Sequence, residues 1–301
     1  MTTLFLDEDQ VRAHLQWPPL IAAMERALIE FSAGQVVQPV RQFLRVERHD
    51  GWFLVMPAIG SSMGVKLVTL YPGNIERGLP THLALILLFR PETGEALAVM
   101  DGRLITEMRT AAVSAAATKL MAVPNARVLA ILGSGVQAHA HVAALEHVRR
   151  FQEIRAWSRT PAKAERFAAE VGARLVPSAE AAVRDADVIV TATTADTPIL
   201  EGAWLKPGAH VNAVGWHGAD SRELDDAAMR HVVVVDSREA ALDQCGDVRG
   251  AGAKIHAELG ELLAGSRTID PSVTTVFESV GIAIEDIAAA ALVYEAASRP
   301  R

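Results

Sequence analysis

A short glycine-rich sequence, ILGSGVQAHAHVAAL at residues 131–145, limits what this chain can fold into more than any other feature. It follows an apolar strand and opens a helix, with the spacing Gly-x-Gly-x-x-Ala at Gly133, Gly135 and Ala138. Glycine permits a tight turn and lets backbone amides approach a pyrophosphate, which then lies at the positive end of the helix. The spacing predicts a dinucleotide-binding loop; the alternative is a tight glycine turn in another kind of α/β protein.

The sequence around this loop supports the first interpretation. From Asn125 onward, apolar strands alternate with helical stretches such as PAKAERFAAEV. The predicted strands are ARVLAIL, EIRAWS, ARLV, ADVIVTAT, AHVNAVG and HVVVVD. Buried parallel strands joined by crossover helices imply an α/β fold with a doubly wound parallel sheet of the Rossmann type.

The N-terminal third has a different pattern. Apolar residues recur at helical spacing from Asp7 to Ala33, with Pro18 and Pro19 opening a second helix and Gly34 ending it. Strand-like runs follow, VRQFLRVE, GWFLVMPA, GVKLVTLYP, THLALILLF and ALAVM, and then the helix DGRLITEMRTAAVSAAATKLMA. These runs predict an antiparallel α+β domain, completed by the apolar C-terminal helix IEDIAAAALVYEAASR. We therefore predict two domains, 1–118 with 280–301 and 119–279.

The composition limits the kinds of ligand and partner that we expect this protein to bind. Half of the 301 residues are hydrophobic and the net charge is -7, with no block of Lys and Arg, which favours a small-molecule ligand over nucleic acid. The N-terminus lacks the pattern of a secretory signal, and the longest aliphatic run, LALILLF, is too short to cross a bilayer, so a cytoplasmic location and no membrane contact are expected. Cys245 is the only cysteine, which excludes disulfides and thiolate metal sites, and no metal is expected.

The end of the second predicted strand bears on the choice of cofactor. EIRAWS runs into Ser158, Arg159 and Thr160, and no acidic residue stands there to bind the ribose 2′-hydroxyl of NAD. Arg159 can form a charge-assisted pair with a 2′-phosphate, so NADP(H) is preferred and NAD(H) is the alternative. In the non-functional interpretation Arg159 only solvates the strand end, and Ser158 or Thr160 caps the helix that Pro161 opens.

An ordered set of motifs extends over nearly the whole chain. They are VQPVRQ around Arg41, GVKLVTLYPGN around Lys66, GLPTH ending at His82, EMRTAAVSA around Arg109, GSGVQA, RELD and FESVGIAIEDIAAA. In these motifs the chain resembles the ornithine cyclodeaminase/mu-crystallin family. The resemblance implies an N-terminal domain that binds substrate and forms a homodimer, and a Rossmann domain that holds the nicotinamide cofactor.

Three cations carry the predicted substrate chemistry. An amino or imino acid presents a carboxylate, which the planar guanidinium groups of Arg41 and Arg109 can bind with two hydrogen bonds. The resemblance places both at carboxylate-binding positions, with Arg109 also beside the cofactor. Lys66 lies within an apolar strand, where an unpaired ammonium is costly; by resemblance it contacts substrate and exchanges a proton at the nitrogen. The alternative is that these side chains extend to water.

The resemblance adds further contacts. Thr81 and His82 correspond to cofactor-side positions, Val136 and Gln137 offer backbone amides to the pyrophosphate, and Ser279 lies near the nicotinamide with Val280 on its substrate side. Thr191 and Thr193 follow the strand DVIV, where a doubly wound sheet exposes its carboxyl ends to ligand. Val214, in the predicted strand AHVNAVG, is a further expected cofactor contact.

Two classes of function remain open. The favoured one is an NADPH-dependent reductase of a cyclic 2-imino acid of the Δ1-pyrroline-2-carboxylate type, with ornithine cyclodeaminase or alanine dehydrogenase as alternatives. The other class is a non-catalytic protein that binds NADPH and a ligand. The presence of both Lys66 and Arg109 favours an enzyme, because a ligand reservoir needs neither.

The loop in VNAVGWHGADSRELDD, residues 211–226, bears on the choice among these reactions. By resemblance, the cyclodeaminases and the alanine dehydrogenase carry an aspartate here that acts as acid or base. Counting back from RELD without a gap puts His217 at that position, which favours imine reduction, since a histidine with a pKa of about 6.5 readily gives up a proton. A gapped alignment puts Asp220 there instead. In the structural alternative both residues only cap the loop and the helix after it.

Overall fold

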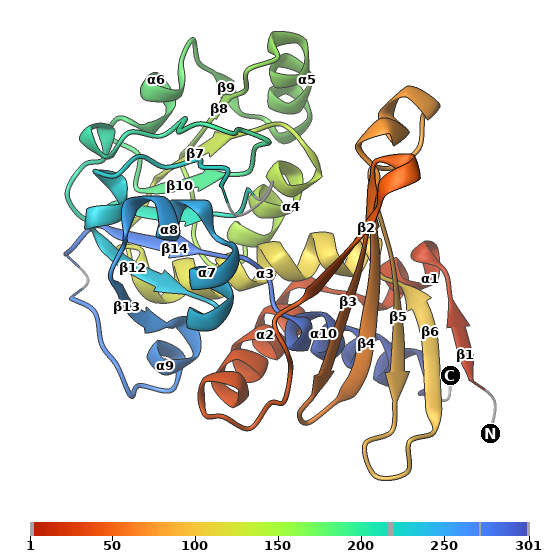
Figure 1. Cartoon of the computed structure of the whole chain (residues 1–301). Coiled ribbons are helices and arrows are strands. Elements are labelled where there is room, and N and C mark those ends of the chain that lie inside the picture. Colours follow the sequence, from red (N-terminus) through yellow and green to blue (C-terminus); the bar gives the residue numbers. More distant parts are fainter. Residues whose placement is uncertain (1–2, 216–219, 271, 300–301) are drawn as a thin grey trace. The chain divides into compact units, whose positions relative to one another are not determined.

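The structure is a computed structural model that describes residues 3–215, 220–270 and 272–299. The chain divides into two compact units, Met1–Arg109 with Gly281–Arg301, and Thr110–Val280. One division point falls inside helix α3 (Arg103–Met121), which the sequence predicted as a single helix. The domain limits 1–118 with 280–301 and 119–279 stay a prediction. Figure 1 shows the helices and strands of each unit.

The first unit is built on a six-stranded sheet in the order β1-β6-β5-β4-β3-β2. Its strands are β1 (Leu4–Leu6), β2 (Gln42–Val46), β3 (Gly51–Ile59), β4 (Met63–Leu70), β5 (His82–Phe89) and β6 (Ala96–Asp101). The predicted antiparallel arrangement is confirmed, because β2 to β6 pair antiparallel in chain order. Strand β1 was not predicted; it pairs parallel with β6, and three residues are too few to show a period.

Helices cover one face of this sheet. They are α1 (Glu8–His14), α2 (Trp17–Ser32) and α10 (Ala283–Ala297), with the short 3-10 helices η1 (Glu47–His49) and η2 (Pro72–Arg77) in the loops. Helix α10 packs on β3, β4 and β5 and against α2, so the C-terminal helix belongs to the N-terminal unit, as predicted. Because side chains alternate along a strand, Lys66 and Ile86 point to this covered face and are buried.

The second unit holds an eight-stranded sheet in the order β13-β12-β14-β11-β10-β7-β8-β9, and among the described residues all of its strand pairs are parallel. The strands are β7 (Val128–Leu132), β8 (Glu153–Trp157), β9 (Arg174–Leu175), β10 (Val188–Thr191), β11 (His210–Ala213), β12 (Val232–Val235), β13 (Ile255–Glu258) and β14 (Thr275–Glu278). The connecting helices are α4 (Val136–Leu145), α5 (Pro161–Val171), α6 (Ala179–Val183), η3 (Gly202–Trp204), η4 (Ala228–Arg230), α7 (Arg238–Gln244), α8 (Gly246–Ala251) and α9 (Leu259–Leu263).

All six predicted parallel strands are present, and the predicted α/β class is correct. Strands β13 and β14 were not predicted. Strand β14 comes last in the chain but lies between β11 and β12, so that Val276 pairs with both Val211 and Val233. It therefore ends at the same sheet edge as the earlier strands, and Ser279 and Val280 follow it there.

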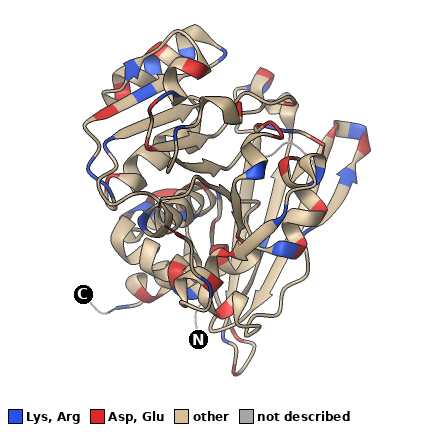
Figure 2. Cartoon of the chain, turned by 90° about the vertical axis from the view of Figure 1, so that its left-hand side faces the viewer, with Lys and Arg blue, Asp and Glu red and all other residues tan. Residues whose placement is uncertain are grey.

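Charge is distributed without large blocks. Figure 2 shows acidic and basic residues interspersed on the helices and loops, while the strands are mostly uncharged. Within the described part of the chain, no helix is long and apolar enough to cross a membrane.

Candidate functional site

The glycine-rich loop between β7 and α4 has the geometry that a pyrophosphate requires. Gly133 has φ +133°, and a Cβ there would lie 2.4 Å from the carbonyl oxygen of Ala192. A Cβ at Gly135 would meet no described atom within 4 Å, and no side chain caps the start of α4 there. Val136, the first residue of α4, is 58% exposed. The amides at this helix start are thus open to an anion, and the loop fits a dinucleotide.

The tip of β8 lies against the same loop. The hydroxyl of Ser134 donates a hydrogen bond to Ser158 Oγ at 3.1 Å, while Arg159 and Thr160 are exposed. Thr160 is the N-cap residue of α5 but makes no side-chain capping hydrogen bond. The capping alternative is therefore not seen for Thr160, and Arg159 stands at the surface where a phosphate can reach it.

A buried glutamate joins the ends of β10 and β11. Glu223 Oε1 accepts hydrogen bonds from the backbone amide and the hydroxyl of Thr193, at 2.7 and 2.5 Å, and Oε2 accepts from the amide of Gly215 at 2.9 Å. Burial raises the pKa of Glu223 to about 7, although the Thr193 hydrogen bonds act to lower it. The predicted residues Thr191 and Val214 lie on the two segments that Glu223 holds, so this residue, which the sequence analysis did not assign, fixes their spacing.

More acidic groups are buried beside Glu223. Asp247 accepts hydrogen bonds from the amides of Glu223 and Leu224, and its ligand atoms lie within 4.8 Å of those of Cys245 and Glu278. Burial raises the pKa of the Cys245 thiol and of Glu278 well above their usual values, which favours the neutral form of each group. This group was not foreseen, and its neutral thiol is a poor metal ligand.

Ser279 and Val280 follow β14 at the same sheet edge, and both are buried. The Ser279 hydroxyl lies 3.4 Å from Asp236 Oδ2, at the end of β12. The structure thus brings Thr191, Thr193, Val214, Ser279 and Val280 to the carboxyl ends of neighbouring parallel strands.

In the first unit, Lys66 and Arg109 are held by two adjacent carboxylates of α10. Lys66 Nζ lies 2.6 Å from Asp286 Oδ2, Arg109 Nε lies 3.0 Å from Asp286 Oδ1, and Arg109 Nη1 lies 2.5 Å from Glu285 Oε2. The exposed fractions of the Lys66 and Arg109 side chains are 2% and 5%, and both acids are at 0%. We call these four residues the ion-pair cluster.

Glu285 and Asp286 lie in the motif FESVGIAIEDIAAA, but no role was predicted for them. The signal was present, because two consecutive acids interrupt the apolar first part of the helix. A buried carboxylate is costly unless a cation neutralises it. The pair therefore indicated partners such as Lys66 and Arg109, which are also buried cations.

Residues around the cluster respond to its charge. Burial lowers the pKa of His82 to about 4, and the Lys66 ammonium acts in the same direction, so His82 is neutral at physiological pH. Thr81 precedes it, and its carbonyl accepts a hydrogen bond from the amide of Tyr71. Arg41 is half-buried before β2, with its guanidinium 5.9 Å from the centre of the Phe43 ring.

The described residues include only one of the two candidates in the loop after β11. His217 lies outside the described residues. Asp220 is exposed in a turn shortly before Glu223. The choice between the ungapped and gapped alignments stays a prediction.

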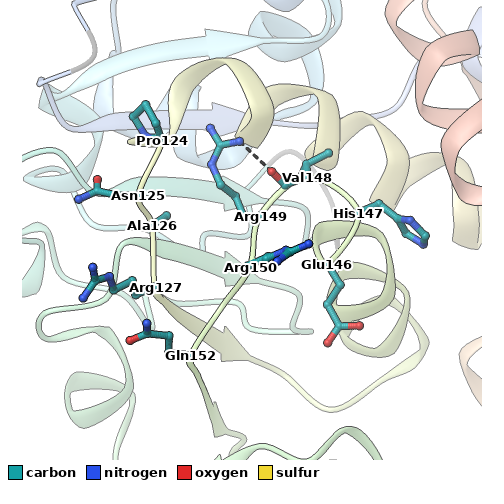
Figure 3. Close-up of a pocket in the computed structure, with 10 residues that line it drawn as sticks. All are labelled: Pro124, Asn125, Ala126, Arg127, Glu146, His147, Val148, Arg149, Arg150 and Gln152. Atoms are coloured by element: carbon teal, nitrogen blue, oxygen red, sulfur yellow. Dashed lines mark hydrogen bonds between the residues drawn. The ribbon is translucent and has the colours of Figure 1, made fainter.

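A pocket of about 640 Å³ lies at the opposite edge of the parallel sheet, before β7 and β8 (Figure 3). Its lining includes Arg127, Arg149 and Arg150 but none of the predicted site residues. The guanidinium of Arg149 is occupied, since it donates to backbone carbonyls at the end of α3 and to that of Val148. The pocket is therefore separate from the candidate site.

The fold and the glycine-rich loop define an α/β protein with a Rossmann-type unit and a second unit that buries a lysine and an arginine on paired acids. The chain belongs to the ornithine cyclodeaminase/mu-crystallin family, whose model matches residues 1–300.

Individual similar proteins and solved structures support this family assignment. Ketimine reductase mu-crystallin of Mus musculus is 49% identical, covering 97% of this chain and 96% of its own. Among solved structures, Thermococcus litoralis Δ1-pyrroline-2-carboxylate reductase in complex with NADH and L-proline has a TM-score of 0.92 and 38% identity, covering 98% of this chain and 97% of its own. An archaeal alanine dehydrogenase dimer with bound NAD has a TM-score of 0.93 and 34% identity, covering 99% and 96%.

Proposed function

We propose that this protein reduces a cyclic 2-imino acid of the Δ1-pyrroline-2-carboxylate type to the amino acid, using a nicotinamide dinucleotide. The observation that carries the proposal is the ion-pair cluster, which buries Lys66 and Arg109, the two cations of the motifs that resemble the family's. The similarity to a ketimine reductase and to a pyrroline-2-carboxylate reductase bound to NADH and L-proline supports the same chemistry.

The proposed residues serve either the substrate or the cofactor. Arg109 and Arg41 bind the substrate carboxylate, because guanidinium groups match its geometry. Lys66 exchanges the proton at the substrate nitrogen, and His217 is the second candidate for this step. When bound, the dinucleotide supplies the hydride. We propose that the residues that contact the dinucleotide are Thr81, His82, Arg109, Gly133, Gly135, Val136, Gln137, Ser158, Arg159, Thr160, Thr191, Thr193, Val214 and Ser279. We propose that Val280 lies near the substrate.

Within this proposal, NADP(H) is preferred over NAD(H). Arg159 is exposed beside Ser158, and no acid stands at the tip of β8 to repel a 2′-phosphate. The neighbour solved with NADH is the reason to measure both cofactors.

We also propose that the protein forms a homodimer through the face of the six-stranded sheet opposite α10. Apolar side chains on this outer face, paired across strands, include Phe5, Leu44, Phe53, Val55, Leu67, Leu83, Leu85, Leu87 and Val99. Four of them, Phe5, Leu44, Leu83 and Leu85, are 42–74% exposed. Large contiguous apolar patches mark interaction sites, and the archaeal relative is a dimer.

Other reactions of the family are the alternatives. Ornithine cyclodeamination or alanine oxidation would need a carboxylate base in the loop after β11, and Asp220 is the residue that would supply it. A protein that only binds NADPH and a ligand is the alternative of another class.

One substrate panel separates these functions. Purified protein is assayed for NADPH and NADH oxidation with Δ1-pyrroline-2-carboxylate, Δ1-piperideine-2-carboxylate and pyruvate plus ammonia, and for ammonia release from ornithine. We expect the cyclic imines to be the best substrates, and Lys66→Met and Arg109→Ala to abolish turnover while Lys66→Met still binds NADPH. Efficient conversion of ornithine with an inactive Asp220→Asn would favour the cyclodeaminase, and tight NADPH binding with no turnover would favour the binding protein.

A further inference from the structure

Asp286 contacts two buried cations at once. Its two carboxylate oxygens contact different cations, Oδ2 the Lys66 ammonium at 2.6 Å and Oδ1 the Arg109 Nε at 3.0 Å. Glu285, the preceding residue, contacts Arg109 through Oε2 and is equally buried. The two acids therefore differ in one respect that an experiment can use, since the ion pair with Lys66 belongs to Asp286.

Titratable groups face Lys66 from several elements. Asp286 faces it from α10, Arg109 from α3, His82 from β5 and Arg41 from the segment before β2, while Thr106 of α3 offers a hydroxyl 3.4 Å from Nζ. Burial and the two arginines disfavour an ammonium at this position, and Asp286 is the group that favours it. The balance lowers the pKa of Lys66 to about 8, which leaves it mostly charged at neutral pH.

We propose that Asp286 is a positioning residue that keeps Lys66 in its ammonium form, and that the Lys66 ammonium is the acid that protonates the substrate nitrogen. The second half of this inference rests on the proposed imine reduction. It extends that proposal by naming the group that keeps the acid charged.

The step is balanced with the groups named. The reductant is the reduced nicotinamide dinucleotide of the proposed function, which would supply a hydride to the carbon of the C=N bond. The π electrons then move to nitrogen, and nitrogen takes one proton from Lys66 Nζ. Lys66 is left as a neutral amine beside the Asp286 carboxylate, and it regains a proton from water before the next turnover. The negative charge of Asp286 makes this recharging favourable in a buried position.

The charge state of Lys66 can be measured without any substrate. The chain contains five lysines, so protein labelled with ¹³C-lysine gives few Cε resonances, and Lys66→Met identifies the one from Lys66. We expect this resonance to titrate with a midpoint near the pKa of about 8. A midpoint below about 6.5 would mean that Lys66 is neutral at physiological pH, and the proposal would be wrong whatever the variants do.

Substitutions at two neighbouring residues then test which acid keeps Lys66 charged. Asp286→Asn removes the charge that contacts Lys66 and should lower the Lys66 midpoint by about 1–3 pH units, the usual effect of a close opposite charge. Glu285→Gln, the matched control on the same helix, removes an equally buried charge from Arg109 and should shift the midpoint by less than half as much. Equal shifts, or no shift with Asp286→Asn, would overturn the role of Asp286. Should Asp286→Asn fail to fold, the wild-type midpoint still decides the charge state.

The pH profile of kcat/KM tests the proton donor. If Lys66 acts as an acid, kcat/KM falls as the pH rises through the pKa of Lys66. Asp286→Asn should move this decline to lower pH, by the same number of pH units as the Lys66 resonance shifts. An alkaline limb that stays in place while the resonance moves would overturn Lys66 as the donor. A wild type that reduces no imine at any pH would contradict the proposed function and the donor step together, while the resonance would still decide whether Asp286 holds the charge.

Discussion

The guanidinium of Arg109 lies against Gly281 so closely that a Cβ on that glycine would stand 2.6 Å from Nη1 and 2.7 Å from Nη2. Gly281 also has φ +76°, a conformation that other residues rarely adopt. The two buried acids of α10 prevent Arg109 from moving aside without breaking an ion pair. The glycine is therefore part of what positions Arg109.

This contact predicts that Gly281→Ala destabilises the protein by about 2–4 kcal/mol, since it adds a steric clash to backbone strain. Gly34→Ala is the control, because Gly34 has a similar φ of +71° with no described atom within 4 Å of its Cβ position. Its cost should be near 1 kcal/mol, on the order of the backbone term alone. Urea unfolding measures both, and equal losses would mean that Arg109 tolerates the extra methyl group.

The Glu223 carboxylate predicts a second effect, on the binding of dinucleotide. Glu223→Gln replaces an acceptor oxygen with a donor, so either Thr193 or Gly215 loses its partner. Leaving one buried donor without its partner costs about 1–3 kcal/mol, which should weaken NADPH by roughly 5–150-fold if the two segments contact the cofactor. Fluorescence titration gives the Kd, with the exposed Glu201→Gln as control; an unchanged Kd would separate Glu223 from the cofactor site.

Buried neutral histidines predict how stability depends on pH. His141 is fully buried between Ser114 Oγ and the carbonyl of Gln137, and burial lowers its pKa to about 4. Unfolded histidine binds a proton below about pH 6.5, so unfolding takes up a proton between about pH 6.5 and 4 and stability falls as the pH falls.

His141→Gln should therefore weaken this pH dependence, by up to about 3 kcal/mol at about pH 4. The exposed His49→Gln serves as the control. Chemical unfolding at a series of pH values measures the slope, and the difference between variants isolates His141 from opposing groups such as Glu223. Parallel curves for wild type and His141→Gln would show that His141 is protonated in the folded state.

Cofactor preference is tested at Arg159. Arg159→Ala should weaken NADPH by about 1.5–3 kcal/mol, the worth of one charge-assisted pair, and NADH by much less. Arg166→Ala removes an exposed arginine of the neighbouring helix α5 and should change neither. Equal wild-type affinities for NADPH and NADH would contradict the preference.

The apolar outer face of the six-stranded sheet predicts that the protein is a dimer. Sedimentation should give a dimer of the 32.2 kDa chain. Leu85→Lys should give a monomer, because it places a charge in an apolar interface. Leu242→Lys changes a similarly exposed leucine on α7 and should leave the dimer intact. A wild type that is monomeric at micromolar concentration would rule out the interface.

The sequence by itself determined what depends on local pattern. The period of the apolar residues predicted six of the eight parallel strands and the antiparallel strands β2 to β6, and the glycine spacing predicted the loop with its open helix start. These features depend on neighbours within a few residues, because the side-chain period and the need for a positive φ are properties of the local backbone.

Tertiary structure decided which distant residues meet. Strand β14 is inserted between β11 and β12, and Asp286, near the end of the chain, pairs with Lys66 in the N-terminal third. A carboxylate in an apolar helix indicates that it needs a cation, but several cations could serve, and sheet order and helix packing select one. The pairing of Lys66 with Asp286 and of Thr193 with Glu223 therefore became visible in the folded chain, because the cost of a buried charge determines that a partner exists and not which residue it is.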